Sequence, residues 1–184
     1  MTRYGCQTDI LHTSVREQTA DCRTLVEFCC GRGDRMKNVA APVMLGVDIH
    51  APYLHLAQKA HPGAVFLHAD ALDACHLFAD ASVDAVLLSD AIEHFEPHDG
   101  LALLEESQRI ARKRVIVFTP DGFYPQEGDP WKLGGGEWQR HRSGWRAADL
   151  KELGFVVEVW PDYHRPTGGQ PAFGALFATW ETKT

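Results

Sequence analysis

The chain has 184 residues, 45% of them apolar, and a formal net charge of −7. This length and composition suit one domain with a single sizeable core, so we expect residues 1–184 to form one unit. No apolar run approaches the roughly 20 residues needed to cross a bilayer, and the first residues lack the apolar stretch of a secretion signal. The five cysteines are odd in number and have no Cys-x-x-Cys spacing, which indicates reduced thiols. We therefore expect a cytoplasmic protein without a membrane contact, and the acidic balance disfavours nucleic acid as a partner.

Apolar strands and amphipathic helices alternate along the chain. The helical segments between the early strands are the crossovers that a parallel sheet requires. Only a Pro- and Gly-rich stretch, 161–171, separates the last two strands, which predicts an antiparallel pair. We predict strands at 24–28, 43–48, 64–67, 83–89, 114–119, 155–160 and 173–181, and helices at 10–20, 33–39, 51–60, 98–112 and 146–153.

The segment 120–145 breaks this alternation. Prolines and glycines interrupt every periodic pattern in it, yet aromatic residues recur at Phe123, Tyr124, Trp131, Trp138 and Trp145. Long loops inside compact domains are usually functional, so we interpret 120–145 as a substrate loop. The alternative is a surface excursion that its aromatic side chains pin to the body.

An acid and a glycine turn follow the first strand. Glu27 closes the apolar run, and Gly31 and Gly33 come directly after it. Glycine permits positive φ and lets a ligand approach the backbone closely. A second acid, Asp48, ends the next strand. Acids at the ends of two successive strands suit a ligand that carries both a ribose and an ammonium group, as S-adenosylmethionine does.

These segments resemble the motifs of the class I S-adenosylmethionine-dependent methyltransferase family, in its small methyltransferase-domain type. Residues 27–33 are similar to the first motif, with Cys29 in place of the first glycine of the usual Gly-x-Gly-x-Gly turn. Residues 46–49, 67–71, 83–95 and 114–122 resemble the later motifs in their expected order, and 141–155 resembles the tract before the sixth strand. A lone glycine turn would be weak support, but ordered motifs are specific.

The resemblance implies an α/β, Rossmann-like domain: a seven-stranded, mostly parallel sheet with an antiparallel last strand and helices on both faces. It implies S-adenosylmethionine as cofactor and S-adenosylhomocysteine as product. Glu27 would face the ammonium group, Asp48 the ribose hydroxyls, and Ile49 and Asp70 the adenine. The expected cofactor-binding residues are Glu27, Cys29, Gly31, Gly33, Asp48, Ile49, Asp70, Ala71, Ser89 and Asp90.

Two histidines are candidates for catalysis. His94 follows the fourth strand, where imidazole could accept a proton near neutral pH; the alternative is a structural hydrogen bond. His141 lies in the long loop between Trp138 and Trp145, and we expect these three residues to contact the acceptor. The alternative is that Trp145 packs under the sheet edge while His141 binds backbone. His94 and His98 have the helical spacing of a metal pair, but no third ligand is apparent, so we expect no metal.

We expect transfer of a methyl group to an oxygen or nitrogen of a small molecule. The chain lacks the Asn/Asp-Pro-Pro-aromatic tetrad of amino-methylating nucleic-acid enzymes, since 89–92 reads Ser-Asp-Ala-Ile. A second hypothesis is a catalytically inactive cofactor-binding module or partner subunit, and a third is a nicotinamide-binding Rossmann domain. The last strands could also pair with a second copy as a homodimer.

Overall fold

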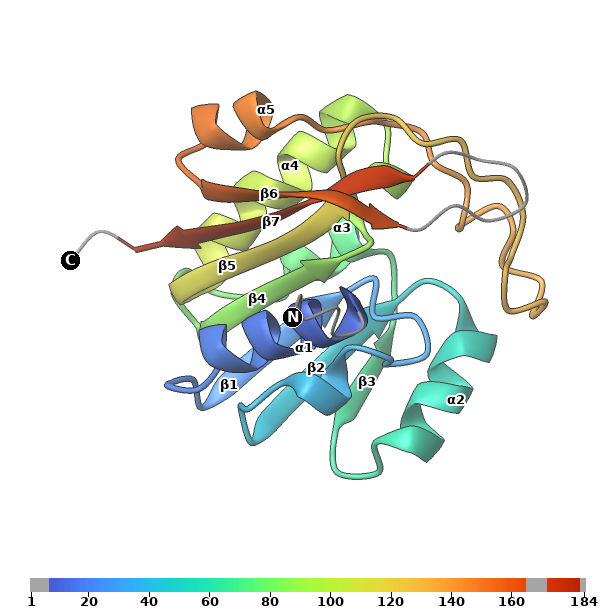
Figure 1. The fold of residues 1–184 in the computed structure, drawn as a ribbon. Coiled ribbons are helices and arrows are strands. Elements are labelled where there is room, and N and C mark those ends of the chain that lie inside the picture. Colours follow the sequence, from blue (N-terminus) through green and yellow to red (C-terminus); the bar gives the residue numbers. More distant parts are fainter. Residues whose placement is uncertain (1–6, 165–171, 183–184) are drawn as a thin grey trace, which may run out of the picture.

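The computed structural model describes residues 7–164 and 172–182 (Figure 1). Five α-helices occur in this part of the chain: α1 (Gln7–Gln18), α2 (Ala51–Ala60), α3 (Ala71–Cys75), α4 (Pro97–Ile110) and α5 (Ala147–Glu152). Two 3₁₀ turns, η1 (Met36–Asn38) and η2 (Ile92–His94), accompany them. The strands are β1 (Thr24–Phe28), β2 (Val43–Asp48), β3 (Val65–His68), β4 (Val83–Ser89), β5 (Ala111–Pro120), β6 (Val156–His164) and β7 (Phe173–Glu181).

The strands form one sheet in the order β3-β2-β1-β4-β5-β7-β6. The pairs among β1 to β5 are parallel, and β7 is antiparallel to both β5 and β6. The predicted α/β class and the antiparallel pairing of the last two strands are therefore confirmed. The strand order reverses between β1 and β4, and open α/β sheets bind ligands beyond the carboxyl ends of their strands at such a point.

The sheet is covered on both faces (Figure 1). Because successive side chains of a strand point to opposite faces, Val86 and Leu88 of β4 join one apolar cluster with α3, α4 and α5. Ala85 and Leu87 join the other cluster, which includes Leu11 of α1. The alternation of fully buried residues explains why the central strands are nearly continuous apolar runs in the sequence.

The helix predictions hold at four of five positions. The predicted helix at 33–39 is wrong: Gly33 has φ +74°, and the chain makes successive turns with only the short η1. The helix predicted to reach residue 112 ends at Ile110, because Ala111 pairs with Val83 and already belongs to β5. The short helix α3 was missing from the predicted elements, and residues 165–171 of the predicted hairpin connection lie outside the described residues.

β7 lies inside the sheet, so β6, not β7, provides the free edge that a second copy could join. Val156 and Val159 of β6 are 72% and 46% exposed. Among the described helices, none combines the length and the apolar character that a membrane span requires.

Asp84 joins the amino ends of β1 and β4, at the sheet edge opposite the strand exits. Its buried carboxylate accepts hydrogen bonds from the backbone N–H groups of Arg23 (2.8 Å) and Thr24 (3.3 Å) and from Arg112 Nη1 (2.9 Å). These donors hold the pKa of the carboxyl below its usual value despite its burial. The charged form is therefore the one that stabilises the fold.

We predict that Asp84→Ala lowers the free energy of unfolding by about 2–4 kcal/mol, because two backbone donors and a guanidinium lose their acceptor. Urea denaturation at neutral pH measures this change. Asp80→Ala is the matched control: Asp80 is 82% exposed and pairs with Arg109, so its removal should cost less than about 1 kcal/mol. Equal costs for the two variants would contradict the role given to Asp84.

Candidate active site

A cavity of about 370 Å³ lies beyond the carboxyl ends of β1 and β4. This volume is within the range of roughly 300–1,000 Å³ that is typical of small-molecule sites. Its walls come from the end of β1 and the glycine turn, from the exit of β4, and from the long loop between β5 and α5. The lining residues used below are Glu27, Cys29, Gly31, Arg35, Ser89, Asp90, Glu93, His94, Tyr124, Trp131 and His141.

Glu27 is a buried carboxylate at the cavity wall. It is 1% exposed, and its Oε2 has no hydrogen-bond partner in the described structure. Burial raises the pKa of this carboxyl to about 8, while the nearby Arg35 guanidinium acts in the opposite direction. A buried carboxylate without a partner is costly, so the site favours a ligand with a positive charge or a donor at this point.

The turn after Glu27 has the conformation that its glycines predict. Gly31 and Gly33 have φ of +53° and +74°. Cys29, which stands where the resembled motif has its first glycine, also has a positive φ of +57°. The backbone therefore keeps the glycine conformation at position 29 although a side chain is present.

Asp48 holds the turn against the start of α2. Its Oδ2 accepts from the Gly31 N–H and its Oδ1 from the His50 N–H, both at 2.8 Å. Each oxygen keeps a second lone pair, so the carboxylate can still accept from a ribose hydroxyl. Asp48 is 8% exposed and does not line the cavity.

The predicted adenine contacts also lie outside the cavity. Asp70 caps α3, with its Oδ1 accepting from the Leu72 N–H at 2.8 Å. Ala71 is the buried first residue of that helix, and Ile49 follows Asp48. The structure thus brings five of the predicted cofactor-binding residues to one cavity: Glu27, Cys29, Gly31, Ser89 and Asp90. The other five do not line it: Gly33, Asp48, Ile49, Asp70 and Ala71.

Arg35 is a cavity residue that sequence reasoning missed. Its Nε lies 3.2 Å from Ser89 Oγ, and its Nη2 lies 3.0 Å from Asp90 Oδ2. Ser89 and Asp90 line the cavity as predicted, but in this structure they hold Arg35. The expectation of a helix at 33–39 concealed this arginine, because a turn directs it into the site.

Backbone contacts pin the long loop onto η2. The Glu93 carbonyl accepts from the N–H groups of Arg142 (2.8 Å) and Ser143 (3.1 Å). Arg142 Nη1 donates to the His94 carbonyl at 2.9 Å, and Ser143 Oγ donates to the Ile92 carbonyl at 3.1 Å. These contacts place His141 beside His94.

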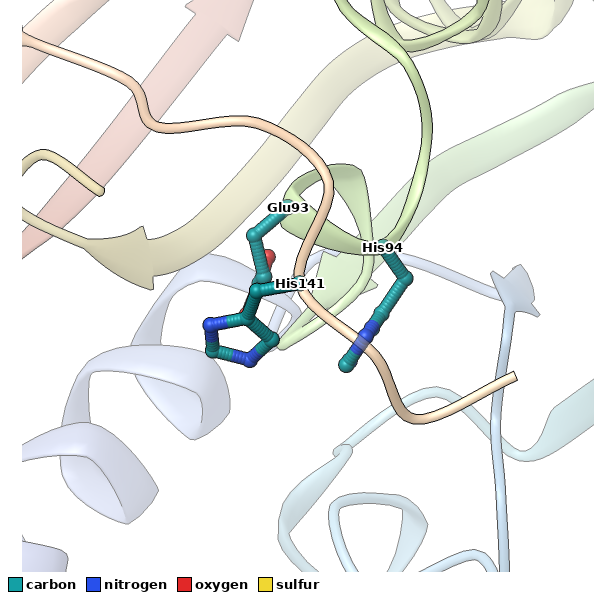
Figure 2. A group of neighbouring side chains, drawn as sticks. All are labelled: Glu93, His94 and His141. Carbon is teal, nitrogen blue, oxygen red and sulfur yellow. The ribbon is translucent and has the colours of Figure 1, made fainter. Parts of the chain in front are cut away.

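The two predicted catalytic histidines therefore meet at one side of the cavity (Figure 2). Their ring centroids are 4.9 Å apart in an edge-on arrangement. Burial lowers the pKa of His94 to about 4 and also lowers the pKa of His141. Both rings are thus neutral near pH 7, and the low pKa makes His94 a weak proton acceptor.

Glu93 is a second residue that the sequence interpretation passed over. Its carboxylate is 1% exposed and accepts from Thr119 Oγ1 at 2.9 Å. Burial raises the pKa of the Glu93 carboxyl to about 8, and the nearby Asp90 carboxylate adds to this increase. The available signal was an acid directly after the apolar pair Ala91-Ile92, where a surface residue would not be expected.

The two tryptophans expected to contact the acceptor do not line the cavity. Trp145 is 4% exposed and packs against α4, so close that a Cβ on Gly100 would lie 2.6 Å from its ring. Its Nε1 donates to Ser143 Oγ at 3.0 Å. Trp138 is 42% exposed on the outside of the loop. For Trp145 the alternative of a structural role therefore describes the structure correctly.

Trp131 does line the cavity, as those two tryptophans were expected to do, but it lies at the glycine turn after β1. Its ring lies over Gly31, where a Cβ would be 3.0 Å away, and the Arg32 guanidinium stacks on it at 4.5 Å. Tyr53 of α2 meets the same ring edge-on at 4.7 Å. The tip of the loop thus covers the glycine turn and the start of α2.

Residues 25–114 match the family model described as "Methyltransferase domain". A comparison with curated proteins found no match.

Many solved structures share the fold. A SAM-dependent methyltransferase from Archaeoglobus fulgidus has a TM-score of 0.63 at 16% identity, over 94% of each chain. The Burkholderia thailandensis 1,6-didemethyltoxoflavin-N1-methyltransferase has a TM-score of 0.67 at 15% identity, over 97% of this chain and 79% of that one. The small RNA methyltransferase HEN1 has a TM-score of 0.65 at 20% identity, over 97% of this chain and 25% of its own. Residues 25–114, from β1 to the start of β5, thus match the methyltransferase-domain model, and the described chain shares the fold of S-adenosylmethionine-dependent methyltransferases.

Proposed function

We propose that this enzyme methylates an oxygen or nitrogen of a small molecule that binds in the cavity described above. The observation that carries the proposal is that one cavity reaches from Glu27 and the glycine turn to His94 and His141. The aromatic side chains of Tyr124 and Trp131 line it from the loop, which suits a compact acceptor. The Burkholderia thailandensis structure, which is similar in fold, is an N1-methyltransferase with bound 1,6-didemethyltoxoflavin and S-adenosylhomocysteine.

The residues at the Glu27 end fit the methionine part of S-adenosylmethionine. The unpartnered Oε2 of Glu27 suits the ammonium group, and the glycine turn leaves room for close approach. Arg35 lines this wall together with Arg32, and the Arg35 guanidinium would bind the cofactor's carboxylate. Asp48 would hold the ribose, and Ile49, Asp70 and Ala71 the adenine, as the family resemblance implies.

When bound, the cofactor supplies an electrophilic methyl group on a sulfonium. Asp90 and, once its proton is released, Glu27 line this end of the cavity and favour that positive charge. The chain's main contribution is to position the acceptor in line with the methyl group and to exclude water. The acceptor's lone pair forms the new bond, the carbon–sulfur electron pair returns to sulfur, and the acceptor's proton leaves to His141 or water.

The direct test is methyl transfer from labelled S-adenosylmethionine to a panel of small hydroxyl, amine and carboxylate compounds. We expect at least one compound class to become labelled, with S-adenosylhomocysteine as co-product. Tight binding of S-adenosylhomocysteine without transfer to any class would instead favour the inactive-module hypothesis.

We predict that Glu27→Gln weakens binding of S-adenosylhomocysteine by about 10- to 100-fold, because a charged hydrogen bond is worth about 1.5–3 kcal/mol. Below a pKa of about 8 the free Glu27 is protonated, so binding of the ammonium group must release its proton. Wild-type affinity should therefore fall as pH is lowered from about 7.5 to about 6, by up to tenfold per unit. Isothermal titration calorimetry measures both effects.

The same titrations on Glu27→Gln should show little pH dependence, because the titrating group is absent. Glu158→Gln is the matched control, since Glu158 is exposed on the edge strand β6, far from the cavity lining. An unchanged affinity in Glu27→Gln would remove Glu27 from the cofactor site.

We predict that Trp131→Ala and Trp138→Ala differ sharply. Trp131 covers the glycine turn, so its truncation should raise the dissociation constant for S-adenosylhomocysteine by about tenfold, the equivalent of about 1.4 kcal/mol. Trp138 lies outside the cavity, and its truncation should change affinity by less than about twofold. Tighter binding in Trp131→Ala would show that the ring obstructs the cofactor instead of covering it.

A further inference from the structure

Glu93, His94 and His141 form a cluster at the acceptor side of the cavity (Figure 2). Each offers a metal-ligand atom, and these atoms all lie within 4.8 Å of one another. His98, the partner considered from sequence spacing, is not part of this cluster: its side chain is 94% exposed and contacts Asp99. The loop instead brings His141 to a residue pair that the sequence shows as neighbours, Glu93 and His94.

Hydrogen bonds fix the state of both imidazole rings. His141 Nδ1 lies 2.6 Å from the Tyr124 carbonyl oxygen, and His94 Nδ1 lies 3.3 Å from the Arg140 carbonyl oxygen. A carbonyl only accepts, so each Nδ1 carries the proton and each Nε2 keeps a lone pair. Metal-ligating histidines usually donate their second ring N–H to a backbone carbonyl or a carboxylate in this way.

We propose that Glu93, His94 and His141 bind one divalent transition-metal ion within the active-site cavity. Two imidazole nitrogens and one carboxylate oxygen are a donor set that suits Zn²⁺, Mn²⁺, Fe²⁺, Co²⁺ or Ni²⁺ better than Ca²⁺ or Mg²⁺. Three protein ligands leave coordination positions open for water or substrate. This expectation replaces the earlier one of no metal.

The scaffold around the cluster is already in place. The Glu93 carboxylate is held by Thr119 of β5, and the Glu93 carbonyl holds the loop through Arg142 and Ser143. Ligand atoms about 2.1 Å from a metal lie about 3–4 Å apart. The present separations of up to 4.8 Å are therefore only about 1 Å wider than a bound metal ion requires.

The metal site also narrows the acceptor, an inference that rests on the proposed function. An open coordination position in the cavity would bind an acceptor oxygen, and a metal ion lowers the pKa of a bound hydroxyl. Because His141 would be a metal ligand in this arrangement, the hydroxyl would lose its proton to water and not to His141. Its oxygen would form the bond to the methyl carbon as the carbon–sulfur electron pair moves to sulfur. This chemistry favours a hydroxyl compound as acceptor.

The test uses the untagged full chain, stripped with a chelator and titrated with Co²⁺ alone and with Zn²⁺ alone. We expect one equivalent to bind by calorimetry, with visible absorption from the bound Co²⁺. His141→Ala and His94→Ala should each weaken binding by about 100-fold or more. His98→Ala, an exposed histidine of the same region, should bind as the wild type does. Circular dichroism confirms that each variant is folded.

Absence of a one-equivalent site in the wild-type chain, or unchanged binding in folded His141→Ala, would overturn the metal site. Binding of S-adenosylhomocysteine to the stripped chain is measured in parallel. Normal cofactor binding without a metal site would reject only this inference. Metal binding without cofactor binding would reject the proposed function and leave the metal site standing.

Discussion

Two carboxylates buried at the carboxyl edge of the sheet set the chemistry of this protein. Glu27 at the end of β1 and Glu93 at the exit of β4 are each 1% exposed, and burial raises the pKa of both carboxyls to about 8. Such groups are costly unless a donor or a cation offsets the loss of water. Glu93 has Thr119, whereas Glu27 keeps one oxygen without a partner. The sheet edge where the strand order reverses thus combines a cavity with two buried acidic side chains, a setting that suits the proposed binding of a cationic cofactor and a metal ion.

The long loop is a structural part of the site because contacts at both sides of the cavity hold it in place. The Glu93 carbonyl accepts hydrogen bonds from two backbone N–H groups of the loop. The tip of the loop reaches the other side of the cavity. There Trp131 lies on Gly31, and the Leu133 carbonyl oxygen lies 2.9 Å from His50 Nε2. The Asp129 carboxylate keeps the tip compact by accepting from the N–H groups of Trp131 and Gly135. One segment therefore contacts both the glycine turn after β1 and the η2 turn after β4.

The sheet was predictable from the sequence, and the loop's path was not. Buried parallel strands are apolar on both faces, so a run such as 83–89 predicts a strand without knowledge of the neighbouring strands. Glycines with positive φ made the turn after Glu27 recognisable for the same local reason. The positions of Arg35, Glu93 and Trp131 depend on contacts between residues more than 25 positions apart, and no local pattern encodes them. Trp145 is an example: the sequence shows an aromatic residue in a loop, and this pattern is the same whether the side chain packs against α4 or lines a cavity.

Cys29 shows how this chain can depart from the usual motif and keep the turn. A residue other than glycine in the left-handed region costs about 1–3 kcal/mol unless its surroundings over-determine the conformation. The surroundings of Cys29 do fix its conformation. The Cys30 N–H donates to the Val47 carbonyl at 3.0 Å, and the Gly31 N–H donates to the Asp48 carboxylate at 2.8 Å. The Cys29 side chain also packs against the core cluster beneath the sheet edge, where glycine would leave space. The strain at residue 29 is therefore offset by hydrogen bonds that tie the turn to the end of β2.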